Sequence, residues 1–422
     1  MTQLKILFSE GSSLTAREFL STLGPAGHHI EVVDPNRICI CRFSRWAKRI
    51  YKTPAPGFYP IDYIKTVNSL MSENAFDILL PTHEQAWLFA AGRSLLPADA
   101  PVALAPLEAF SRVESKLEFA RLLDDIGLPQ PKWGLAHSPH DLGEWKYPFY
   151  LKAPFSTAGM GVRRAINARD AENAFMHFRN TGHKGPLMVQ AAVQGEYAQV
   201  QALFDDGRLI AAHTSAQTAV GIGPSAAGRV SVDHPFARRD VAALGEYLHW
   251  HGGLTLDYLF GTKDYAYIEC NPRTVEPANA AASGVDLPSL QLRLSLGEHP
   301  DPVPAGRTGM RTHSSLAILL GTAAYQRSRS HVIGEALRIL SHHGRFKESS
   351  EYLTPIRHDF PSIIPLAFVA IRALLFPKSV EQFVASAVGA YSVTPGAIEQ
   401  VTKMVKSAME GNHIPGENSE LQ

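Results

Sequence analysis

The chain has 422 residues, of which 45% are apolar and 19% charged, as in an ordinary globular protein with two or three domains. Its 40 basic and 40 acidic residues cancel, so no net field is expected to draw it to nucleic acid or to an anionic membrane. The three cysteines are expected to be reduced thiols, and no basic run precedes an apolar core at the N-terminus, so we expect a cytoplasmic protein without a signal peptide.

The first hundred residues predict a parallel α/β domain. Apolar strands alternate with helices at residues 4–8, 15–23, 29–34, 61–74 and 76–81. Glu84 follows the last strand, at the end of the sheet where ligands gather in such folds, so it can either contact a substrate or cap the next helix. The domain is expected to close near residue 106.

Two lysines stand in informative surroundings. Lys116 lies near a helix start within the helical pattern of residues 107–126, where a lysine alone is usually solvated. Lys152 interrupts an apolar strand at residues 147–154, and a buried ammonium group needs an anionic partner. Backbone N–H groups of the small residues that follow can converge on phosphate oxygens, although the order is not that of a P-loop; these residues are Ser156, Thr157, Gly159 and Gly161.

The middle of the chain predicts further strands. Residues 186–190 and 198–204 have strand patterns, and a tight turn joins the second to a return strand at 209–214. Residues 220–229 are rich in glycine, so we expect a mobile loop near a site there. A helix is predicted over residues 238–251.

The most informative stretch is a predicted β-hairpin over residues 254–273. If its loop comprises residues 262–264, Asp257 lies opposite Glu269, with Cβ atoms about 5 Å apart. Asn271 then lies on the same face, and such a set of hard oxygen ligands suits Mg²⁺. A surface hairpin whose acids face water is the alternative, and a two-residue turn would place the acids on opposite faces.

Helical patterns occupy much of the C-terminal part, at residues 332–342 and 362–390. The run 363–376 is apolar nearly all round, which predicts burial against the rest of the protein or against a second subunit. Because this run is shorter than a bilayer span and contains Arg372, no membrane segment is expected.

The chain resembles the ATP-grasp superfamily, most closely the carboxylate–amine ligases of its carbamoyl-phosphate-synthetase-like branch. The resemblance rests on an ordered set of motifs, namely Lys116, Lys152 with its glycine loop, residues 190–196, Asp257 and residues 269–273. It implies an α/β protein in which two α+β subdomains sandwich ATP. The implied parts are a Rossmann-like pre-ATP-grasp domain at 1–106, an ATP-grasp domain at 107–300 with its lid at about 130–190, and a mainly helical C-terminal extension at 301–422.

The resemblance also implies a role for each motif. It places the ATP phosphates against Lys116, Lys152, Ser156, Thr157, Gly159 and Gly161, and the adenosine against Gln190, Ala191, Val193 and Glu196. It makes Asp257, Glu269 and Asn271 the ligands of Mg²⁺, which Mn²⁺ can replace. Arg273, with Lys152, would steady the transferred phosphoryl group or the acyl phosphate.

Two positions depart from the family pattern. Gln190 and Ala191 stand where many members have a glutamate-containing hinge, and binding of adenine through backbone atoms tolerates this change. Thr255 stands where an arginine is usual, which leaves Arg229 and Arg273 as candidates for the contact with the γ-phosphate.

The motifs together predict an ATP-dependent ligase that activates a small-molecule carboxylate as an acyl phosphate and couples it to an amine, releasing ADP and phosphate. Expected partners are these two substrates, without nucleic acid or membrane, and a homodimer is allowed. The alternatives are a carboxylase subunit, a small-molecule kinase and a non-catalytic nucleotide-binding regulator. The complete metal-ligand set argues against the regulator. Cys270 is expected to pack in the core, because strand alternation points it away from the acids.

Overall fold

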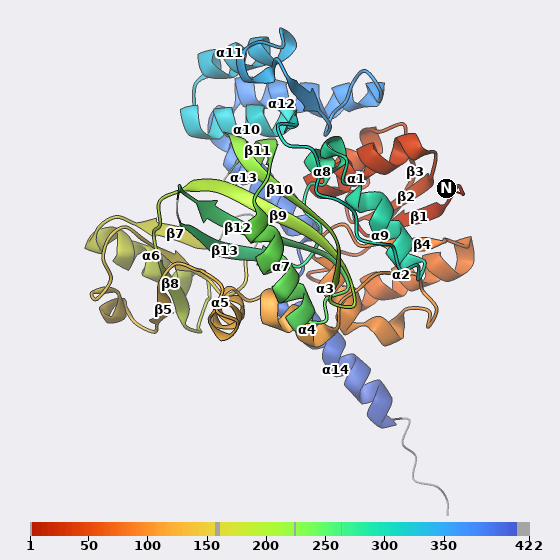
Figure 1. The fold of residues 1–422 in the computed structure, drawn as a ribbon, viewed down its shortest axis with the longest axis horizontal. Helices are drawn as coiled ribbons and strands as arrows, with labels where there is room; N and C mark the ends of the chain where they lie inside the picture. Colours follow the sequence, from red (N-terminus) through yellow and green to blue (C-terminus); the bar gives the residue numbers. More distant parts are fainter. Residues whose placement is uncertain (1, 157–160, 223–224, 263, 412–422) are drawn as a thin grey trace, which may run out of the picture.

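The computed structural model describes residues 2–156, 161–222, 225–262 and 264–411 (Figure 1). The strands form three sheets, of four, four and seven strands. Figure 1 shows the N-terminal sheet in red and orange on the right, a small sheet in olive on the left, and the large sheet in green between them. Helices of the C-terminal third cover the top of the large sheet in this view.

The N-terminal sheet is parallel, with the order β3-β2-β1-β4. Its strands are β1 (Lys5–Phe8), β2 (His29–Asp34), β3 (Ala47–Lys52) and β4 (Ile78–Leu80), and the helices of this region are α1 (Leu14–Leu23), α2 (Pro60–Asn74) and α3 (Gln85–Ala91). The hydroxyl of Ser13 caps α1 by accepting a hydrogen bond from the Ala16 N–H. Strand β3 was not predicted, because its charged residues leave it half-exposed at the edge of the sheet.

The small sheet is antiparallel, with the order β5-β8-β6-β7. Its strands are β5 (Trp133–Ala136), β6 (Phe149–Lys152), β7 (Val162–Ala165) and β8 (Leu187–Ala191), and α6 (Ala168–Asn180) packs on it. The helical stretch predicted at 107–126 is two helices, α4 (Leu107–Val113) and α5 (Lys116–Asp125). Ser115 breaks it by adopting an extended conformation and capping α5, which puts Lys116 at a helix N-terminus.

The large sheet has the order β13-β12-β9-β10-β11-β14-β15. Its strands are β9 (Glu196–Asp205), β10 (Arg208–Val220), β11 (Ala226–Val232), β12 (Gly252–Phe260), β13 (Tyr265–Asn271), β14 (Arg311–His313) and β15 (Ser349–Glu351). One face is apolar and packs against α7 (Pro235–Tyr247). The other face carries polar residues, which include Gln199, Ser215, Asp257 and Glu269 in one row across four paired strands.

The mobile loop predicted at residues 220–229 is wrong for half of that stretch, because β10 ends at Val220 and β11 begins at Ala226; residues 223 and 224 lie outside the described residues. The glycines there allow close packing. A Cβ on Gly228 would lie 2.8 Å from the Thr218 hydroxyl oxygen, and one on Gly321 would lie 2.6 Å from the Gly221 carbonyl oxygen. Small residues in this segment therefore mark contact between strands and helix rather than freedom of the chain.

The hairpin of β12 and β13 has the predicted pairing through a different turn. Pairing ends at Phe260 opposite Tyr265, so the connection is residues 261–264 and not 262–264. A register shift between Asp257 and Tyr258 then leaves Ile268 as an extra residue on β13. This bulge restores Asp257 to its place opposite Glu269.

The C-terminal third is mostly helical, and its two short strands belong to the large sheet. Its helices are α8 (Ala278–Ser283), α9 (Leu287–Ser295), α10 (Ser315–Gln326), α11 (Arg329–Leu340), α12 (Ile363–Leu375), α13 (Val380–Tyr391) and α14 (Pro395–Gly411). The helix predicted at 362–390 is broken at residues 377–379, where Pro377 begins a 3₁₀ turn.

The first of the two coverings predicted for the apolar run 363–376, the rest of the protein, is wrong for its outer side, whereas burial against a second subunit stays a prediction. Ile364, Phe368, Ile371 and Leu375 are each more than half exposed, whereas the inward side of α12 is buried. Among the described residues no single helix is long and apolar enough to cross a membrane. The helical segments Phe360–Leu375 and Pro377–Ala385 are together long and apolar enough to do so, but the chain bends by 113° between them.

A buried ion pair ties α1 to the segment before α12. The Arg17 guanidinium donates to the Asp359 carboxylate at 2.6 Å, and neither side chain is exposed. Asp359 also accepts a hydrogen bond from the Arg45 N–H at 2.7 Å. Removing one partner of a buried pair leaves the other charge without compensation.

We therefore expect Asp359→Ala to lower the free energy of unfolding by about 3–5 kcal/mol in urea denaturation. The control is Asp125→Ala, which removes the exposed pair of Asp125 with Arg112 and should cost no more than about 1 kcal/mol. Equal losses in the two variants would contradict a structural role for the buried pair.

Candidate active site

The paired carboxylates of the hairpin form the centre of the site. Asp257 and Glu269 are directly opposite each other on β12 and β13, and the Asn271 amide donates to Asp257 at 3.3 Å. Burial, and then the charge of Glu269, raise the pKa of Asp257 to about 7. Burial alone would also raise the pKa of Glu269, but Lys116 and Lys152 lower it below its ordinary value. The lysines thus keep Glu269 ionised, whereas no neighbouring cation within the described residues is strong enough to offset the rise in the pKa of Asp257.

The donor set fits a hard divalent cation. The two carboxylates and the Asn271 amide share one face of the hairpin, where a cation would relieve the repulsion between the acids. In the part of the chain that the structure describes, no three His, Cys, Asp or Glu side chains are placed to hold a metal ion. Two carboxylates and an amide therefore leave most of the coordination to other oxygens, as Mg²⁺ commonly requires when it binds phosphates.

Both predicted lysines lie at this pair. The Lys116 ammonium group contacts Glu269 at 3.0 Å and donates to the Ser156 carbonyl at 3.0 Å. The Lys152 ammonium group donates to the carbonyl of Ile268, the bulge residue, at 3.2 Å. Burial lowers the pKa of Lys152 to about 8, against the opposing charge of Glu269. Two ammonium groups, both nearly buried, are therefore available for an anion beside the carboxylates.

The loop after Lys152 begins beside the site, where the Ser156 carbonyl accepts a hydrogen bond from Lys116. Thr157 and Gly159 lie outside the described residues, whereas Ser156 and Gly161 are within them. A Cβ on Gly161 would lie 2.3 Å from the Ser156 Cβ, so this position requires glycine. The Ser156 hydroxyl is buried without a hydrogen-bond partner among the described residues. The ring of Phe155 stacks on Trp87 of α3, with centroids 6.1 Å apart.

The two candidate arginines approach the site from different elements. Arg229 on β11 pairs with Glu276 at 2.9 Å, and Arg273 contacts the His83 ring nitrogen at 3.0 Å. Each arginine has a buried Nη1 atom that lacks a hydrogen-bond partner within the described part of the chain. Both side chains also act electrostatically on Asp257. Unpaired buried guanidinium nitrogens indicate that an anionic ligand completes the site.

The segment predicted to bind adenosine lies at the junction of β8 and β9. Gln190 is buried opposite Trp133 and Tyr150, Ala191 ends β8, and Glu196 begins β9 opposite Phe260. Val193 lies in the connection between the two strands. No contact among the described residues joins these four positions directly to Asp257 or Glu269.

The structure adds site residues that the sequence did not single out. The Tyr197 hydroxyl bonds to the Asp257 carboxylate, and burial raises the pKa of this tyrosine. Gln199 lies opposite both Asp257 and Ser215, and its Nε2 and the Ser215 hydroxyl are buried without partners among the described residues. The polar residues at alternate positions of β9 were the available signal.

Glu114, at the break between α4 and α5, is a second addition. Burial, and then the charge of Glu84, raise the pKa of Glu114 to about 8, and Arg273 and Lys116 act in the opposite direction. Its Oε1 atom is buried without a partner among the described residues. Sequence reasoning missed it because a glutamate between two helices is usually solvated.

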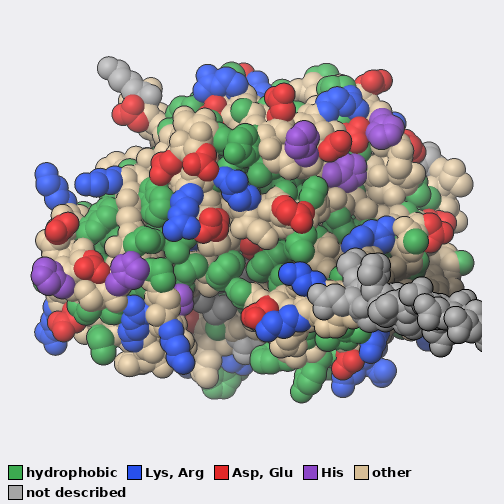
Figure 2. Space-filling view, turned by 90° about the horizontal axis from the view of Figure 1, so that it is seen from below, with side chains coloured by type: hydrophobic (Ala, Val, Ile, Leu, Met, Phe, Trp, Pro, Cys, Tyr) green, Lys and Arg blue, Asp and Glu red, His purple; other side chains and the backbone are tan. Residues whose placement is uncertain are grey.

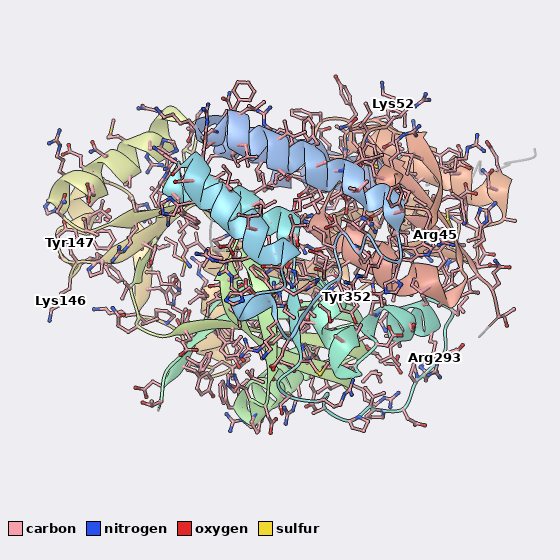
Figure 3. All side chains as sticks on the ribbon, turned by 90° about the horizontal axis from the view of Figure 1, so that it is seen from above. Arg45, Lys52, Lys146, Tyr147, Arg293 and Tyr352 are labelled. Atoms are coloured by element: carbon pink, nitrogen blue, oxygen red, sulfur yellow. The ribbon has the colours of Figure 1, made fainter. Side chains whose placement is uncertain are left out.

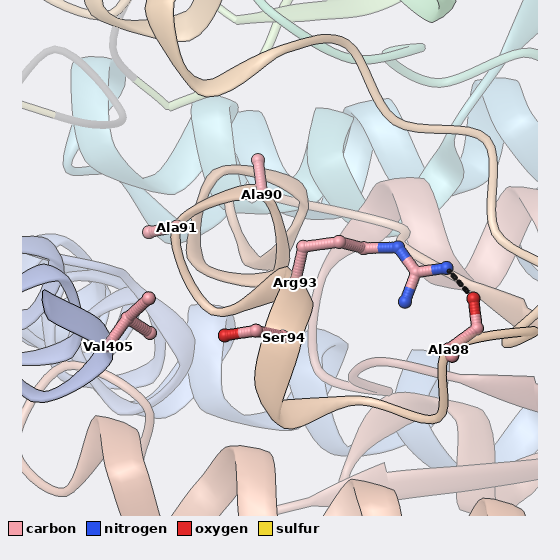
Figure 4. Close-up of a pocket in the computed structure, with 6 residues that line it drawn as sticks. All are labelled: Ala90, Ala91, Arg93, Ser94, Ala98 and Val405. Carbon is pink, nitrogen blue, oxygen red and sulfur yellow. Dashed lines mark hydrogen bonds between the residues drawn. The ribbon is translucent and has the colours of Figure 1, made fainter. Parts of the chain in front are cut away.

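Figure 4 shows an open pocket elsewhere, with a volume of about 540 Å³. It is lined by Ala90, Ala91, Arg93, Ser94, Ala98 and Val405, and Arg93 donates to the Ala98 carbonyl at 2.9 Å. None of the residues around Asp257 lines it. The buried unpartnered polar atoms, and not this pocket, mark the candidate site.

No family model matches the chain, but curated proteins do. Acetyl-CoA carboxylase of Dictyostelium discoideum is 27% identical over 179 residues, which are 39% of this chain and 8% of that protein. The carbamoyl phosphate synthase large chain of Pyrococcus furiosus is 20% identical over 202 residues, which are 45% of this chain and 19% of that protein. The chain thus spans less than a tenth of the first relative and about a fifth of the second.

Solved structures share the fold over most of the chain. The biotin carboxylase domain of Hydrogenobacter thermophilus 2-oxoglutarate carboxylase, in complex with MgADP, ADP and bicarbonate, has a TM-score of 0.55 at 17% identity and covers 73% of this chain and 74% of that one. L-amino acid ligase from Bacillus licheniformis has a TM-score of 0.53 at 14% identity, with coverage of 71% and 75%. N5-carboxyaminoimidazole synthetase from Staphylococcus aureus with ADP has a TM-score of 0.56 at 13% identity, with coverage of 73% and 80%.

At these identities the structural likeness concerns the fold, which is the mixed α/β fold of ATP-grasp proteins. The sequence similarities to acetyl-CoA carboxylase and to carbamoyl phosphate synthase agree with the motifs described above. The sequence similarities and the shared fold thus agree in relating the chain to the carbamoyl-phosphate-synthetase-like branch of the ATP-grasp superfamily.

Proposed function

We propose that the chain is an ATP- and Mg²⁺-dependent ligase that joins a small-molecule carboxylate to an amine. The observation that carries this proposal is the facing pair of buried Asp257 and partly exposed Glu269, held beside the ammonium groups of Lys116 and Lys152. A site with this charge pattern suits a metal-bound triphosphate, because the acids hold the cation and the lysines hold the phosphate oxygens.

The nucleotide would lie between the small sheet and the large sheet. In this proposal the loop at Ser156 and Gly161 covers the phosphates, and the segment from Gln190 to Val193 offers backbone groups to adenine, with Glu196 at the ribose. Residues 1–106 serve as the pre-ATP-grasp domain, 107–300 as the ATP-grasp domain and 301–422 as an extension. Strands β14 and β15 of that extension pair within the large sheet, so it is continuous with the ATP-grasp core.

The chemistry would proceed by attack of a substrate carboxylate on the γ-phosphate, followed by attack of an amine on the acyl phosphate. Mg²⁺, when bound by Asp257, Glu269 and Asn271, would neutralise phosphate charge and align the transferred group. The unpartnered Nη1 atoms of Arg229 and Arg273 would bind the developing anionic oxygens. The protein's own part is positioning and charge neutralisation, and no side-chain nucleophile is needed.

The relatives support this reaction class and leave its substrates open. Carboxylases and an amino acid ligase share the fold, so the activated acid in this chain is either bicarbonate or an organic carboxylate. Buried donors at Gln199, Ser215 and Arg229 suit the anionic form of either acid.

The experiment is to incubate the purified protein with ATP and Mg²⁺ and to measure release of ADP and phosphate across pools of carboxylic acids, bicarbonate, amino acids and amines. Release that requires both an acid and an amine supports the ligase. Release with bicarbonate and an amine alone assigns a carboxylation. A stable phosphoester from one acceptor assigns a kinase, and tight ATP binding without turnover in any pool favours a regulator.

We expect Asp257→Asn and Glu269→Gln each to lower kcat/KM by a factor of about 100–1000, because each removes a charge that holds the metal-bound triphosphate. The control is Asp205→Asn at the far end of β9, where the acid pairs with Arg208 and His299. That variant should keep its activity within about a factor of two. Comparable losses in all three variants would point to folding rather than to the site.

We expect Gly161→Ala to raise the KM for ATP about tenfold, because the added methyl group displaces Ser156 and with it the carbonyl bonded to Lys116. Gly185→Ala, in the connection between α6 and β8, is the control, since a Cβ there meets nothing closer than 3.8 Å. Steady-state kinetics with varied ATP separate the two variants. A normal KM for ATP in Gly161→Ala would remove the loop from the nucleotide site.

A further inference from the structure

Ten large apolar side chains are exposed on and beside α11 and α12, and we call this surface the α11–α12 face. On α11 they follow the helical spacing i, i+4, i+7, and on α12 they continue through i, i+4, i+7, i+11. Their exposed fractions range from 40% to 78%. They are Ile333, Leu337 and Leu340, then Phe360, Ile363, Ile364, Phe368, Ile371, Leu375 and Phe376.

The two helices lie side by side with their inner sides already satisfied. Arg329, which begins α11, donates to the Leu375 carbonyl at the end of α12, so the helices run antiparallel. Val332 of α11 and Val369 and Ala373 of α12 are buried in one shared cluster. Figure 3 shows both helices, in cyan and light blue, across the upper side of the molecule. The exposed residues therefore form an additional apolar surface on helices that already have a core.

The exposed apolar area of this surface is larger than that of the largest apolar patch on a typical monomeric protein. The ten side chains expose on the order of 1000 Å², whereas the largest apolar patch of a typical monomer is about 300–600 Å². Exposed apolar residues elsewhere on the chain, such as Ile38, Phe58 and Ile166, are widely separated in sequence. A patch of this size indicates a surface that is covered in use.

The charge around the α11–α12 face is positive. Residues 327–380 hold eight Arg and Lys and four Asp and Glu, although the whole chain is balanced. Glu335 pairs with Arg338 and Arg345, Asp359 pairs with Arg17, and Arg327 pairs with Glu381. Outside these pairs the segment has five basic residues, Arg329, Lys347, Arg357, Arg372 and Lys378, against the two acids Glu348 and Glu351. Helix α12 itself contains no acidic residue. On the opposite side of the molecule, apolar side chains are interspersed with acidic and basic ones (Figure 2).

These charges decide between the candidate occupants. In a symmetric dimer the face would meet its own copy, and the basic residues would face one another without enough acids to pair them. A neutral apolar partner would leave the same residues without compensation. An anionic bilayer surface supplies both an apolar layer for the stripes and phosphate and carboxylate groups for the rim.

We propose that the α11–α12 face docks the protein on the surface of an anionic lipid bilayer. The stripes of Phe368, Ile371 and Leu337 enter the boundary between headgroups and acyl chains, and the exposed Arg329, Lys347 and Lys378 contact the headgroups. The helices lie in the interface and do not span the bilayer. This attachment is independent of the reaction proposed above, and it replaces the expectation of no membrane contact drawn from the balanced total charge.

The test is co-sedimentation of the full chain with large unilamellar vesicles at about physiological ionic strength. One set of vesicles contains phosphatidylcholine alone, and the other contains about 30% phosphatidylserine as the anionic lipid. The wild-type protein should bind the anionic vesicles at least about tenfold more tightly than the neutral ones, and 0.5 M NaCl should weaken the binding severalfold, as about a 4 Å Debye length predicts.

The variant Phe368→Ser/Ile371→Ser should lose at least about tenfold in affinity for the anionic vesicles, because it removes apolar surface from the bilayer boundary. The matched control is Ile38→Ser/Phe58→Ser, which removes residues of 68% and 73% exposure from the N-terminal region and should bind as the wild type does. Lys347→Gln/Lys378→Gln should flatten the salt dependence while leaving the apolar stripes intact. Circular dichroism and ATP binding establish that each variant is folded.

Three outcomes would overturn the proposal. The first is no binding of the wild type to either vesicle. The second is vesicle binding that Phe368→Ser/Ile371→Ser leaves unchanged. The third is a wild-type dimer in sedimentation velocity that this variant converts to a monomer while vesicle binding is absent, which would assign the face to a second copy of the chain.

Discussion

The arrangement of the site depends on the repulsion between two facing carboxylates. Asp257 and Glu269 lie opposite each other across one rung of a hairpin, where Asp257 is buried and Glu269 is partly exposed. Each neighbouring element supplies part of the compensation. Helix α5 begins at Lys116, strand β6 ends at Lys152, and strand β9 places the Tyr197 hydroxyl on Asp257. Three separate parts of the fold thus converge on one pair of acids, and the compensation is still incomplete without a cation.

The sequence predicts those parts that depend on local pattern. Alternation along residues 254–273 placed the two acids on one face and Cys270 in the core, where it is buried. Lys116 was placed near a helix start, and it is the first residue of α5, which Ser115 caps. The predicted turn of the hairpin was one residue too short. The sequence does not reveal the bulge at Ile268, because it lies within an alternating run of aromatic and aliphatic residues.

The remaining site residues escaped prediction because their partners are distant in sequence. Glu114 lies near Glu84 and Arg273, and Ser215 meets Gln199 only after β10 has paired with β9 in the large sheet. The α11–α12 face escaped for a related reason. The apolar run 363–376 predicts that something covers it, but only the packed structure shows which side the rest of the chain leaves uncovered.

The C-terminal segment joins the fold at the loop that follows β4. The backbone carbonyl of Tyr391 accepts a hydrogen bond from Gln85 at 2.7 Å, and the Val393 N–H donates to Glu84 at 3.0 Å. The Tyr391 ring meets the His83 ring edge to face, and His83 contacts Arg273. Shortening the chain before residue 391 would therefore disturb Arg273 through His83, which contacts it. The last described helices act as a brace for the candidate site, even though more than a hundred residues separate them from Arg273 in the sequence.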